Sequence, residues 1–215
     1  MSAGDFQRDI VIGFADAVAA AHDLLTRLDQ HSGDGDFGDN LRGGMDIAVQ
    51  RLVDATESPL SVLGAVFLDD VGGTSGPLLG LLFTEIAVAV ADDPASAGSW
   101  ADGLTAGLAA IVRVGEAAVG DRTMVDALAP AAESLSATGD FVSAAEAAAE
   151  GMRATASLRA RMGRASYLGD RARGEPDPGA GGVALFLWVV ATVLTGSSVA
   201  PPLDCGLEAL DIGRR

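Results

Sequence analysis

The sequence predicts an all-α fold, built as eight helices in one domain. Apolar residues recur at spacings of three and four, which is typical of amphipathic helices, and no segment shows the alternation of a strand. The composition is 49% hydrophobic but only 5% aromatic, with 28 glycines, which favours closely packed helices over aromatic-rich sheets. A length of 215 residues suits a single domain over residues 1–215, with a core at about 5–197 and a short C-terminal tail.

The first helix is expected over Asp5–Leu28, with Ile10, Phe14 and Val18 on its apolar face. Glycine, proline and capping residues delimit the helices that follow, and Thr123 and Asp140 are expected to be N-caps. These helices are expected at Asn40–Val53, Pro59–Asp70, Gly76–Val90, about Trp100–Val119, Thr123 to about Ser136, and Asp140 to about Arg161. The eighth, Gly181–Leu194, is apolar nearly all round and is therefore expected at the centre of the fold.

The overall charge and hydropathy exclude several classes of partner. The formal net charge is −16 and the sequence has no lysine, which disfavours binding to a nucleic-acid backbone. The N-terminus has no basic segment of a signal peptide, and the longest apolar run, the twelve residues Val183–Leu194, is too short to span a bilayer. We therefore expect a soluble cytoplasmic protein with no nucleic-acid or membrane partner. The single cysteine, Cys205, excludes an intrachain disulfide.

An acidic glycine loop follows the first expected helix. Asp29, Asp34 and Asp36 fall within eight positions, and neighbouring carboxylates repel one another unless a cation lies among them. Few arginines are near, so a hard divalent metal bound by oxygen ligands is the favoured interpretation. The alternative is a solvated turn that caps the next helix through Asp36 or Asp39.

Two familiar motifs do not explain this loop. Gly33, Gly35 and Gly38 have the spacing of a dinucleotide-binding fingerprint, but that fingerprint requires a preceding strand, and here a helix precedes it. A calcium-binding EF-hand loop that begins at Asp34 would need an acid where Met45 stands.

Three further loops could bind a ligand, although each alone is compatible with an ordinary turn. Gly72–Pro77 opens a helix, where backbone N–H groups favour an anion. Gly120–Asp126 is a turn that leads into a helix. The long loop Gly163–Gly179 is rich in arginine, and long loops in compact domains are commonly functional. Since alternate connections of an up-and-down bundle lie at the same end, we expect these loops and the acidic loop to converge there.

Taken in order, the four segments resemble the nucleotide-binding L subunit of dihydroxyacetone kinases, which also forms the C-terminal domain of single-chain, ATP-dependent kinases. The resemblance runs from about Asp5 to Ser197. The matching segments are LDQHSGDGDFGDN from Leu28, GGTSGP from Gly72, GDRTMVD from Gly120, and GRASYLGDR from Gly163 followed by DPGA from Asp177. This family implies an eight-helix, barrel-like up-and-down bundle whose nucleotide and metal site lies in the loops at one end.

The resemblance also implies a set of ligand contacts, without identifying a catalytic side chain. Asp29, Asp34 and Asp36 are expected to hold two Mg²⁺ ions that bridge the phosphates of ADP or ATP. Met124 is expected to pack on the adenine, and Arg164 to close over the nucleotide with the segment from Asp177. The full set of expected nucleotide contacts is Phe37, Gly38, Asp39, Asn40, Gly73, Thr74, Ser75, Gly115, Met124, Arg164, Asp177, Pro178 and Gly179.

The family resemblance further implies phosphotransferase activity that depends on a second chain. In the family, a separate K subunit captures dihydroxyacetone through a histidine, and the L subunit delivers the phosphoryl group. The phosphoryl donor is either ATP or a protein of a phosphotransferase system, and the sequence leaves both open.

Three departures from the family pattern affect the substrate. Phe37 and the pair Glu175–Pro176 stand where the family usually has histidine, and Arg122 stands where it has lysine. Another small ketose, such as a tetrulose, therefore remains open beside dihydroxyacetone. Two alternative functions also remain: the nucleotide-binding domain of a fatty-acid kinase, and a nucleotide-bound, non-catalytic regulator of a transcription factor, which an acidic surface would suit.

Overall fold

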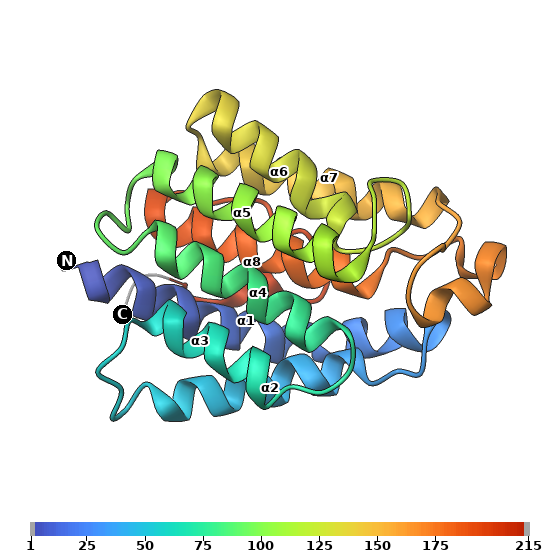
Figure 1. The fold of residues 1–215 in the computed structure, drawn as a ribbon, viewed down its shortest axis with the longest axis horizontal. Coiled ribbons are helices and arrows are strands. Elements are labelled where there is room, and N and C mark those ends of the chain that lie inside the picture. The colour runs from blue at the N-terminus through green and yellow to red at the C-terminus, as the bar shows by residue number, and fades with distance from the viewer. Residues whose placement is uncertain (1–2, 213–215) are drawn as a thin grey trace.

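The computed structural model describes residues 3–212 and contains eight α-helices, with no strand among those residues (Figure 1). The helices are α1 (Ala3–Ser32), α2 (Phe37–Arg51), α3 (Pro59–Asp69), α4 (Ser75–Ala89), α5 (Ala97–Gly115), α6 (Val125–Thr138), α7 (Phe141–Ala154) and α8 (Pro178–Thr195). Short 3₁₀ turns lie at Thr155–Ser157, Arg164–Tyr167, Gly169–Ala172 and Leu207–Ala209. The prediction of an all-α fold is confirmed.

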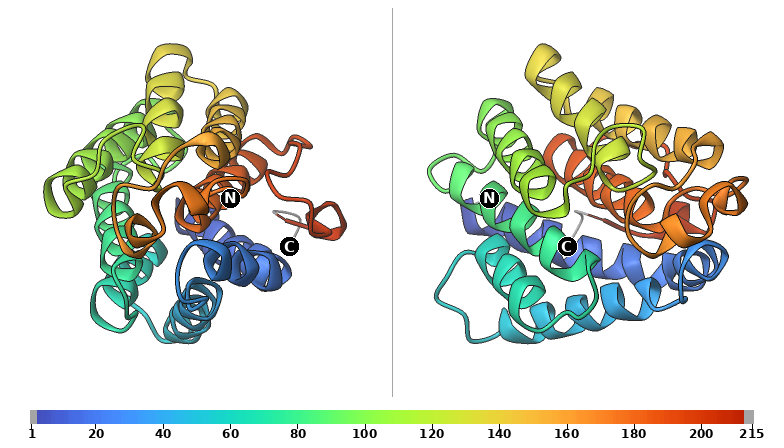
Figure 2. Two further views of the ribbon diagram at one scale, coloured as in Figure 1. Left: turned by 90° about the vertical axis from the view of Figure 1, so that its right-hand side faces the viewer. Right: turned by 45° about the vertical axis from the view of Figure 1, so that its right-hand side comes forward.

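The helices form a closed ring. Each helix packs against the next along the chain, and α8 returns to pack against α1. The end-on view shows this ring, with the segment between α7 and α8 lying across its near end (Figure 2). Connections of alternate helix pairs therefore meet at one end of the bundle.

An aromatic cluster joins four of the helices at the core. Phe83 of α4 makes edge-to-face contacts with Phe14 of α1, Phe67 of α3 and Phe186 of α8, with ring centroids 5.1–6.1 Å apart. All four rings are buried. Such pairs stabilise the fold beyond the area they remove from water, so this cluster fixes how α1, α3, α4 and α8 meet.

The central helix is longer than predicted. Its 18 residues, Pro178–Thr195, exceed the twelve-residue apolar run and are long and apolar enough to cross a membrane by length and composition. In the structure 83% of this helix is buried against the other helices. It is the core helix that its uniformly apolar sequence predicts.

The largest errors in the predicted C-terminal ends are in three helices, and the first of them, α1, continues four residues beyond Leu28 to Ser32. The fifth helix ends at Gly115 rather than near Val119, because Glu116 adopts a left-handed conformation with φ of 55°. The seventh ends at Ala154 rather than near Arg161, since Thr155 begins a 3₁₀ turn and its hydroxyl accepts a hydrogen bond from the backbone N–H of Asp177 at 2.8 Å.

The predicted caps are half correct. Asp140 caps α7 by accepting hydrogen bonds from the backbone N–H groups of Val142 and Ser143, as expected. Thr123 lies one residue before the N-cap position of α6, which Met124 occupies, and its hydroxyl accepts a hydrogen bond of 3.2 Å from the backbone N–H of Val125, the first residue of the helix.

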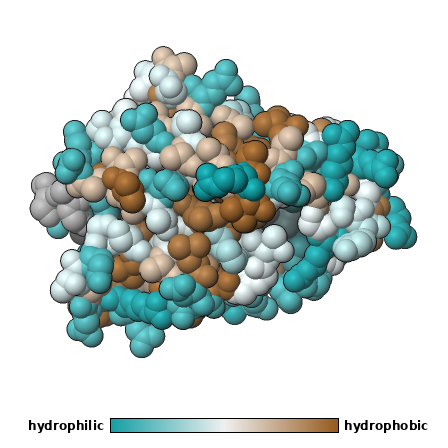
Figure 3. Space-filling view, in the orientation of Figure 1, coloured by the Kyte–Doolittle hydropathy of each residue, from teal (hydrophilic) through white to brown (hydrophobic). Residues whose placement is uncertain are grey.

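Hydrophobic side chains are exposed along the middle of one face, where α4 and α5 lie, and mostly hydrophilic ones cover the right-hand end of the molecule (Figure 3). The exposed apolar residues on these two helices are Val88, Val112 and Val114. The end that carries the alternate loops is therefore mostly polar at its surface.

Candidate functional site

One pocket lies where the four loops converge, as predicted from their alternation along the chain. Its lining comes from the α1–α2, α3–α4 and α5–α6 connections and from the long α7–α8 segment. The expected site residues found in this lining are Asp29, Asp34, Asp36, Phe37, Asn40, Gly73, Thr74, Ser75, Gly115, Met124, Arg164, Asp177, Pro178 and Gly179. Side chains more than a hundred positions apart in sequence thus share one cavity.

Two expected contacts lie outside the pocket lining. Gly38 packs so closely on α1 that an added Cβ would collide with the Thr26 hydroxyl. The carboxylate of Asp39 lies 2.8 Å from Nε2 of His22 on α1. Both residues join α2 to α1, and their contact with a nucleotide stays a prediction.

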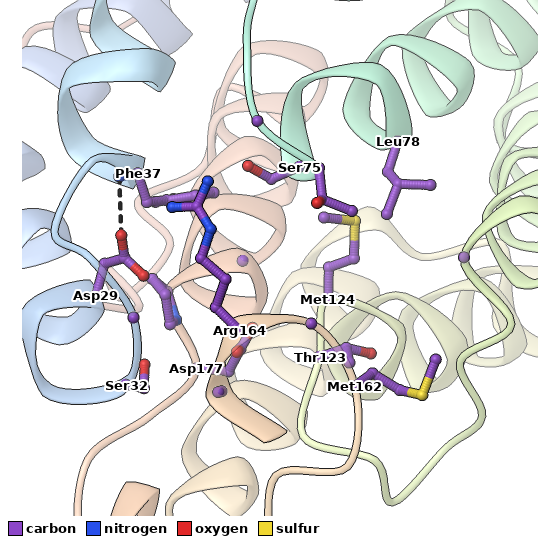
Figure 4. A pocket seen from close by; sticks show the side chains of 18 of the residues that line it. Asp29, Ser32, Phe37, Ser75, Leu78, Thr123, Met124, Met162, Arg164 and Asp177 are labelled. Carbon is purple, nitrogen blue, oxygen red and sulfur yellow. Dashed lines mark hydrogen bonds between the residues drawn. The ribbon is translucent and has the colours of Figure 1, made fainter. Parts of the chain in front are cut away.

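Asp29 begins the acidic end of the pocket. It lies in the last turn of α1, which extends four residues beyond its predicted end at Leu28. Its Oδ2 accepts a hydrogen bond of 3.0 Å from the backbone N–H of Phe37, the first residue of α2 (Figure 4). This bond fixes one carboxylate against the start of the next helix.

The capping explanation for the acidic loop is not what the structure shows. Asp36 occupies the N-cap position of α2, but its side chain accepts no capping hydrogen bond. Asp39 lies within the first turn of α2 and contacts His22 instead. The carboxylate of Asp36 is thus left to the pocket rather than to the helix.

The charges that line the pocket leave an excess of two negative charges. The acids are Asp29, Asp34, Asp36 and Asp177, and the bases are Arg122 and Arg164. Asp34 forms an ion pair with Arg164, and Asp177 with Arg122 at 3.7 Å. Within residues 3–212, neither Asp29 nor Asp36 has such a partner. Oxygen donors with this charge suit a divalent cation such as Mg²⁺.

The three predicted metal ligands do not form a metal site in the described residues. Across the described part of the chain, no three histidine, cysteine or acidic side chains lie close enough together to hold a metal ion. Asp29, Asp34 and Asp36 line the same cavity, while Arg164 engages Asp34. The donor chemistry therefore fits Mg²⁺, and ligation by these three residues stays a prediction.

The N-terminus of α4 faces the middle of the pocket. Gly73 adopts a left-handed conformation with φ of 76°, which turns the chain into the helix. Thr74 occupies the cap position without making a side-chain capping bond. The first N–H groups of a helix have no partners within it, and together with the helix dipole they favour an anion.

The far end of the pocket is apolar and was mostly missed by sequence reasoning. Met124 was expected there, and Leu78 lies close to it (Figure 4). Other apolar residues of the lining that were not expected are Ile111, Ala117, Val125, Met162 and Ala165. Two of these apolar residues could have been predicted from the sequence. Leu78 lies three residues after Ser75, and Ile111 lies four residues before Gly115, so each shares a helix face with an expected site residue. An apolar slot of this kind accommodates a flat ring.

Asp177 is a polar residue of the pocket lining and the N-cap of α8. Its Oδ2 accepts a hydrogen bond of 2.9 Å from the backbone N–H of Ala180, which caps the helix. Burial raises the pKa of this carboxyl to about 6, although the Ala180 bond and the Arg122 charge both act to lower it. Arg122 also lines the pocket and was not among the expected contacts.

Fold and pocket together define an all-helical binding domain whose site is acidic at one end, has a helix N-terminus in the middle and is apolar at the other end. The chain belongs to the DAK2 domain family, whose model matches residues 31–192. The resemblance to the L subunit of dihydroxyacetone kinases is thereby confirmed.

Relatives in this family are kinases by name. The chain is 35% identical over 180 residues to the ADP-binding subunit of a PEP-dependent dihydroxyacetone kinase from Listeria innocua, covering 80% of this chain and 88% of that protein. It is 37% identical over 184 residues to an L-erythrulose 1-kinase from Mycolicibacterium smegmatis, covering 80% of this chain but 32% of that protein. The chain thus spans about a third of the length of the erythrulose kinase.

A solved structure shares the fold. The crystal structure of the dihydroxyacetone kinase from C. freundii in complex with AMP-PNP and Mg²⁺ aligns with a TM-score of 0.68 and 26% sequence identity. The alignment covers 87% of this chain and 33% of that one. The helical bundle described above therefore has the fold of about a third of that larger kinase chain.

Proposed function

We propose that this chain is the nucleotide-binding component of a dihydroxyacetone-type kinase. It binds ADP or ATP with Mg²⁺ in the pocket and transfers a phosphoryl group to a small ketose held on a separate K subunit. The observation that carries the proposal is the order of chemistry along the pocket: surplus carboxylates, then the N-terminus of α4, then an apolar slot. A metal-bound triphosphate or diphosphate joined to a flat base presents the complementary order.

The acidic end is the proposed metal site. Asp29, Asp34 and Asp36 would hold two Mg²⁺ ions, which neutralise phosphate charge during the transfer. The Phe37 N–H holds the Asp29 carboxylate in place before any ligand arrives. Three carboxylates without a lysine nearby suit a site that relies on metal for charge neutralisation.

The rest of the pocket binds and shields the nucleotide. Backbone N–H groups at Gly73–Ser75 donate to the phosphates, and Leu78 and Met124 pack on the base. Arg164 extends between the acidic side and the α4 side of the pocket, so its loop covers the phosphates and excludes water (Figure 4).

A partner chain supplies the ketose in this proposal. The described pocket lining contains neither histidine nor lysine, the side chains that could bond a ketone covalently. Phe37 is buried where the family motif has histidine, and the relatives include erythrulose kinases. We therefore propose a three- or four-carbon ketose as the acceptor.

The test is reconstitution with the K subunit of a dihydroxyacetone kinase. Purified subunits would be mixed with dihydroxyacetone or erythrulose, and with ATP or a phosphotransferase donor protein. The proposal predicts ketose phosphorylation only when both subunits and one donor are present. A fatty-acid kinase or a transcriptional regulator would bind nucleotide but leave every ketose unmodified, which would refute the proposal.

A further inference from the structure

Arg122 is a buried cation that the proposed function does not use. Its side chain is completely buried, and the residue has a left-handed backbone with φ of 63°, which is uncommon outside glycine. It lies in the turn between α5 and α6, directly before Thr123 and Met124. A charge is costly to bury unless its partners compensate it, so these partners indicate what the residue does.

All of its partners lie in a single distant segment. Nη2 donates a hydrogen bond of 2.9 Å to the carbonyl of Glu175 and one of 3.5 Å to the carbonyl of Pro176. Nη1 lies 3.7 Å from Oδ1 of Asp177. One planar guanidinium thus engages three consecutive residues, a geometry that the compact ammonium of lysine cannot reproduce.

Both ends of this contact are held by further bonds. Asp126 accepts hydrogen bonds from the N–H groups of Gly120 and Thr123, at 2.5 and 2.8 Å, which fixes the turn that carries Arg122. On the other side, Asp177 donates to Thr155 and caps α8. The guanidinium therefore connects two segments that are each held by hydrogen bonds of their own.

The two joined segments pack against each other in the lining of the pocket. Met124 follows the turn and Gly179 follows Asp177, and an added Cβ on Gly179 would lie 3.5 Å from the Met124 Cβ. Nε and Nη1 of Arg122 have no hydrogen-bond partner. The orientation of the guanidinium is therefore set by its hydrogen bonds to the carbonyl groups of residues 175 and 176 and by the charge of Asp177. The Arg122 contacts to residues 175–177 therefore hold this part of the pocket lining together.

We propose that Arg122 is a positioning residue, whose guanidinium holds segment 175–179 against turn 120–124 so that both face the nucleotide at a fixed separation. The inference rests on the proposed function for its ligand. Its structural half, the coupling of the two segments, does not depend on a nucleotide and can be measured separately.

The test compares three variants by hydrogen exchange of the unliganded protein and by calorimetric titration of Mg-ADP. Arg122→Met removes the positive charge and approximately keeps the side-chain volume. Arg122→Lys keeps the charge but loses the planar guanidinium with its several N–H donors. Arg161→Met is the matched control, because the exposed Arg161 side chain pairs with Asp121 in the same turn at 3.4 Å.

We expect Arg122→Met to accelerate amide hydrogen exchange in residues 118–126 and 175–181 and to leave the exchange rates of α3 unchanged. The same variant should weaken the binding of Mg-ADP about tenfold or more. Arg122→Lys should restore the melting temperature, since an ammonium still compensates Asp177, but not the affinity. Arg161→Met should match the wild type. A purely structural role would restore stability and affinity together.

Wild-type exchange in both segments of Arg122→Met would overturn the inference, as would wild-type affinity in Arg122→Lys. If Arg122→Met does not fold, the lysine variant alone decides the question by the same two measurements. If the wild type binds no Mg-ADP, the proposed function fails, while the exchange rates still decide whether Arg122 couples the segments.

Discussion

The backbone N–H of Phe37 donates a hydrogen bond of 3.0 Å to Oδ2 of Asp29, across the turn between α1 and α2. Because Phe37 is the first residue of α2, its N–H has no partner within the helix, and the carboxylate satisfies it. The Phe37 side chain is buried, which anchors the donor. One member of the acidic set is thus positioned by the fold itself.

Asp36 gives the first prediction. Asp36→Asn should remove one ligand charge and weaken Mg²⁺-dependent ADP binding at least tenfold in a calorimetric titration. The fold should remain intact, with an equal or higher melting temperature, because the Asp36 side chain makes no capping bond and repulsion among the acids is relieved.

Asp140→Ala is the control for this change. Asp140 caps α7 by accepting hydrogen bonds from the N–H groups of Val142 and Ser143, so removing its side-chain oxygens should lower the melting temperature and leave ADP binding unchanged. If Asp36→Asn instead lowered the melting temperature and bound ADP normally, the acidic loop would be structural.

Arg164 should have opposite effects on two ligands. Since it pairs with Asp34, Arg164→Gln should strengthen binding of Mg²⁺ alone, because the metal no longer competes with a guanidinium. The same variant should weaken the binding of Mg-ADP, since a side chain that closes over the phosphates is lost. Mn²⁺ binding followed by electron paramagnetic resonance, beside ADP titration, measures both effects.

Arg171→Gln serves as the control for Arg164, because Arg171 is exposed in the same segment and has no ion pair within the described residues. It should leave both affinities unchanged. A parallel loss of Mg²⁺ and ADP binding in Arg164→Gln would contradict the competition described here.

Two adjacent glycines of α2 should respond in opposite directions to alanine. A Cβ on Gly44 would lie 2.6 Å from Val71 and 2.9 Å from Phe67, so Gly44→Ala should destabilise the protein by about 1–3 kcal/mol. Gly43 has nothing within 4 Å, so Gly43→Ala should stabilise it by about 0.5–1 kcal/mol through helix propensity.

Urea unfolding measures both changes. Equal effects in the two variants would mean that α2 does not pack on the C-terminal end of α3 as closely as described.

His22 should make stability depend on pH. Its hydrogen bonds to Asp39 and Asp23 raise the pKa of the imidazole above its usual 6.5. A folded-state pKa above the unfolded value means that the stabilisation is complete below pH 6.5 and is lost as pH rises through the folded pKa. The stability difference between the wild type and His22→Gln should therefore be larger at pH 6 than at pH 8.5. An equal difference at both values would show that the charged imidazole does not join α1 to α2.

The sequence predicted the helices well because their signals are local. Apolar spacing located all eight helices, and Asp140 was correctly identified as a cap. The ends at Gly115 and Ala154 were missed because they depend on a left-handed Glu116 and on a contact between Thr155 and Asp177. Neither of these two features can be recognised from the spacing of apolar residues along the chain.

The same division applies to the pocket. The glycine-rich motifs identified its polar residues, because polar atoms on special turns are visible in sequence. Met162 carries no local signal of this kind, and only the three-dimensional arrangement of the helices brings it to the cavity. The role of Arg122 depends on a segment more than fifty residues away and could not be predicted from its own turn.

The central claim is that the pocket binds an adenine nucleotide together with Mg²⁺. Calorimetric titration of the wild-type chain with ADP, with and without Mg²⁺, tests it directly. We predict saturable binding with Mg²⁺ that is lost when EDTA removes the metal. Absence of ADP and ATP binding in Mg²⁺, or equal affinity with and without the metal, would contradict it.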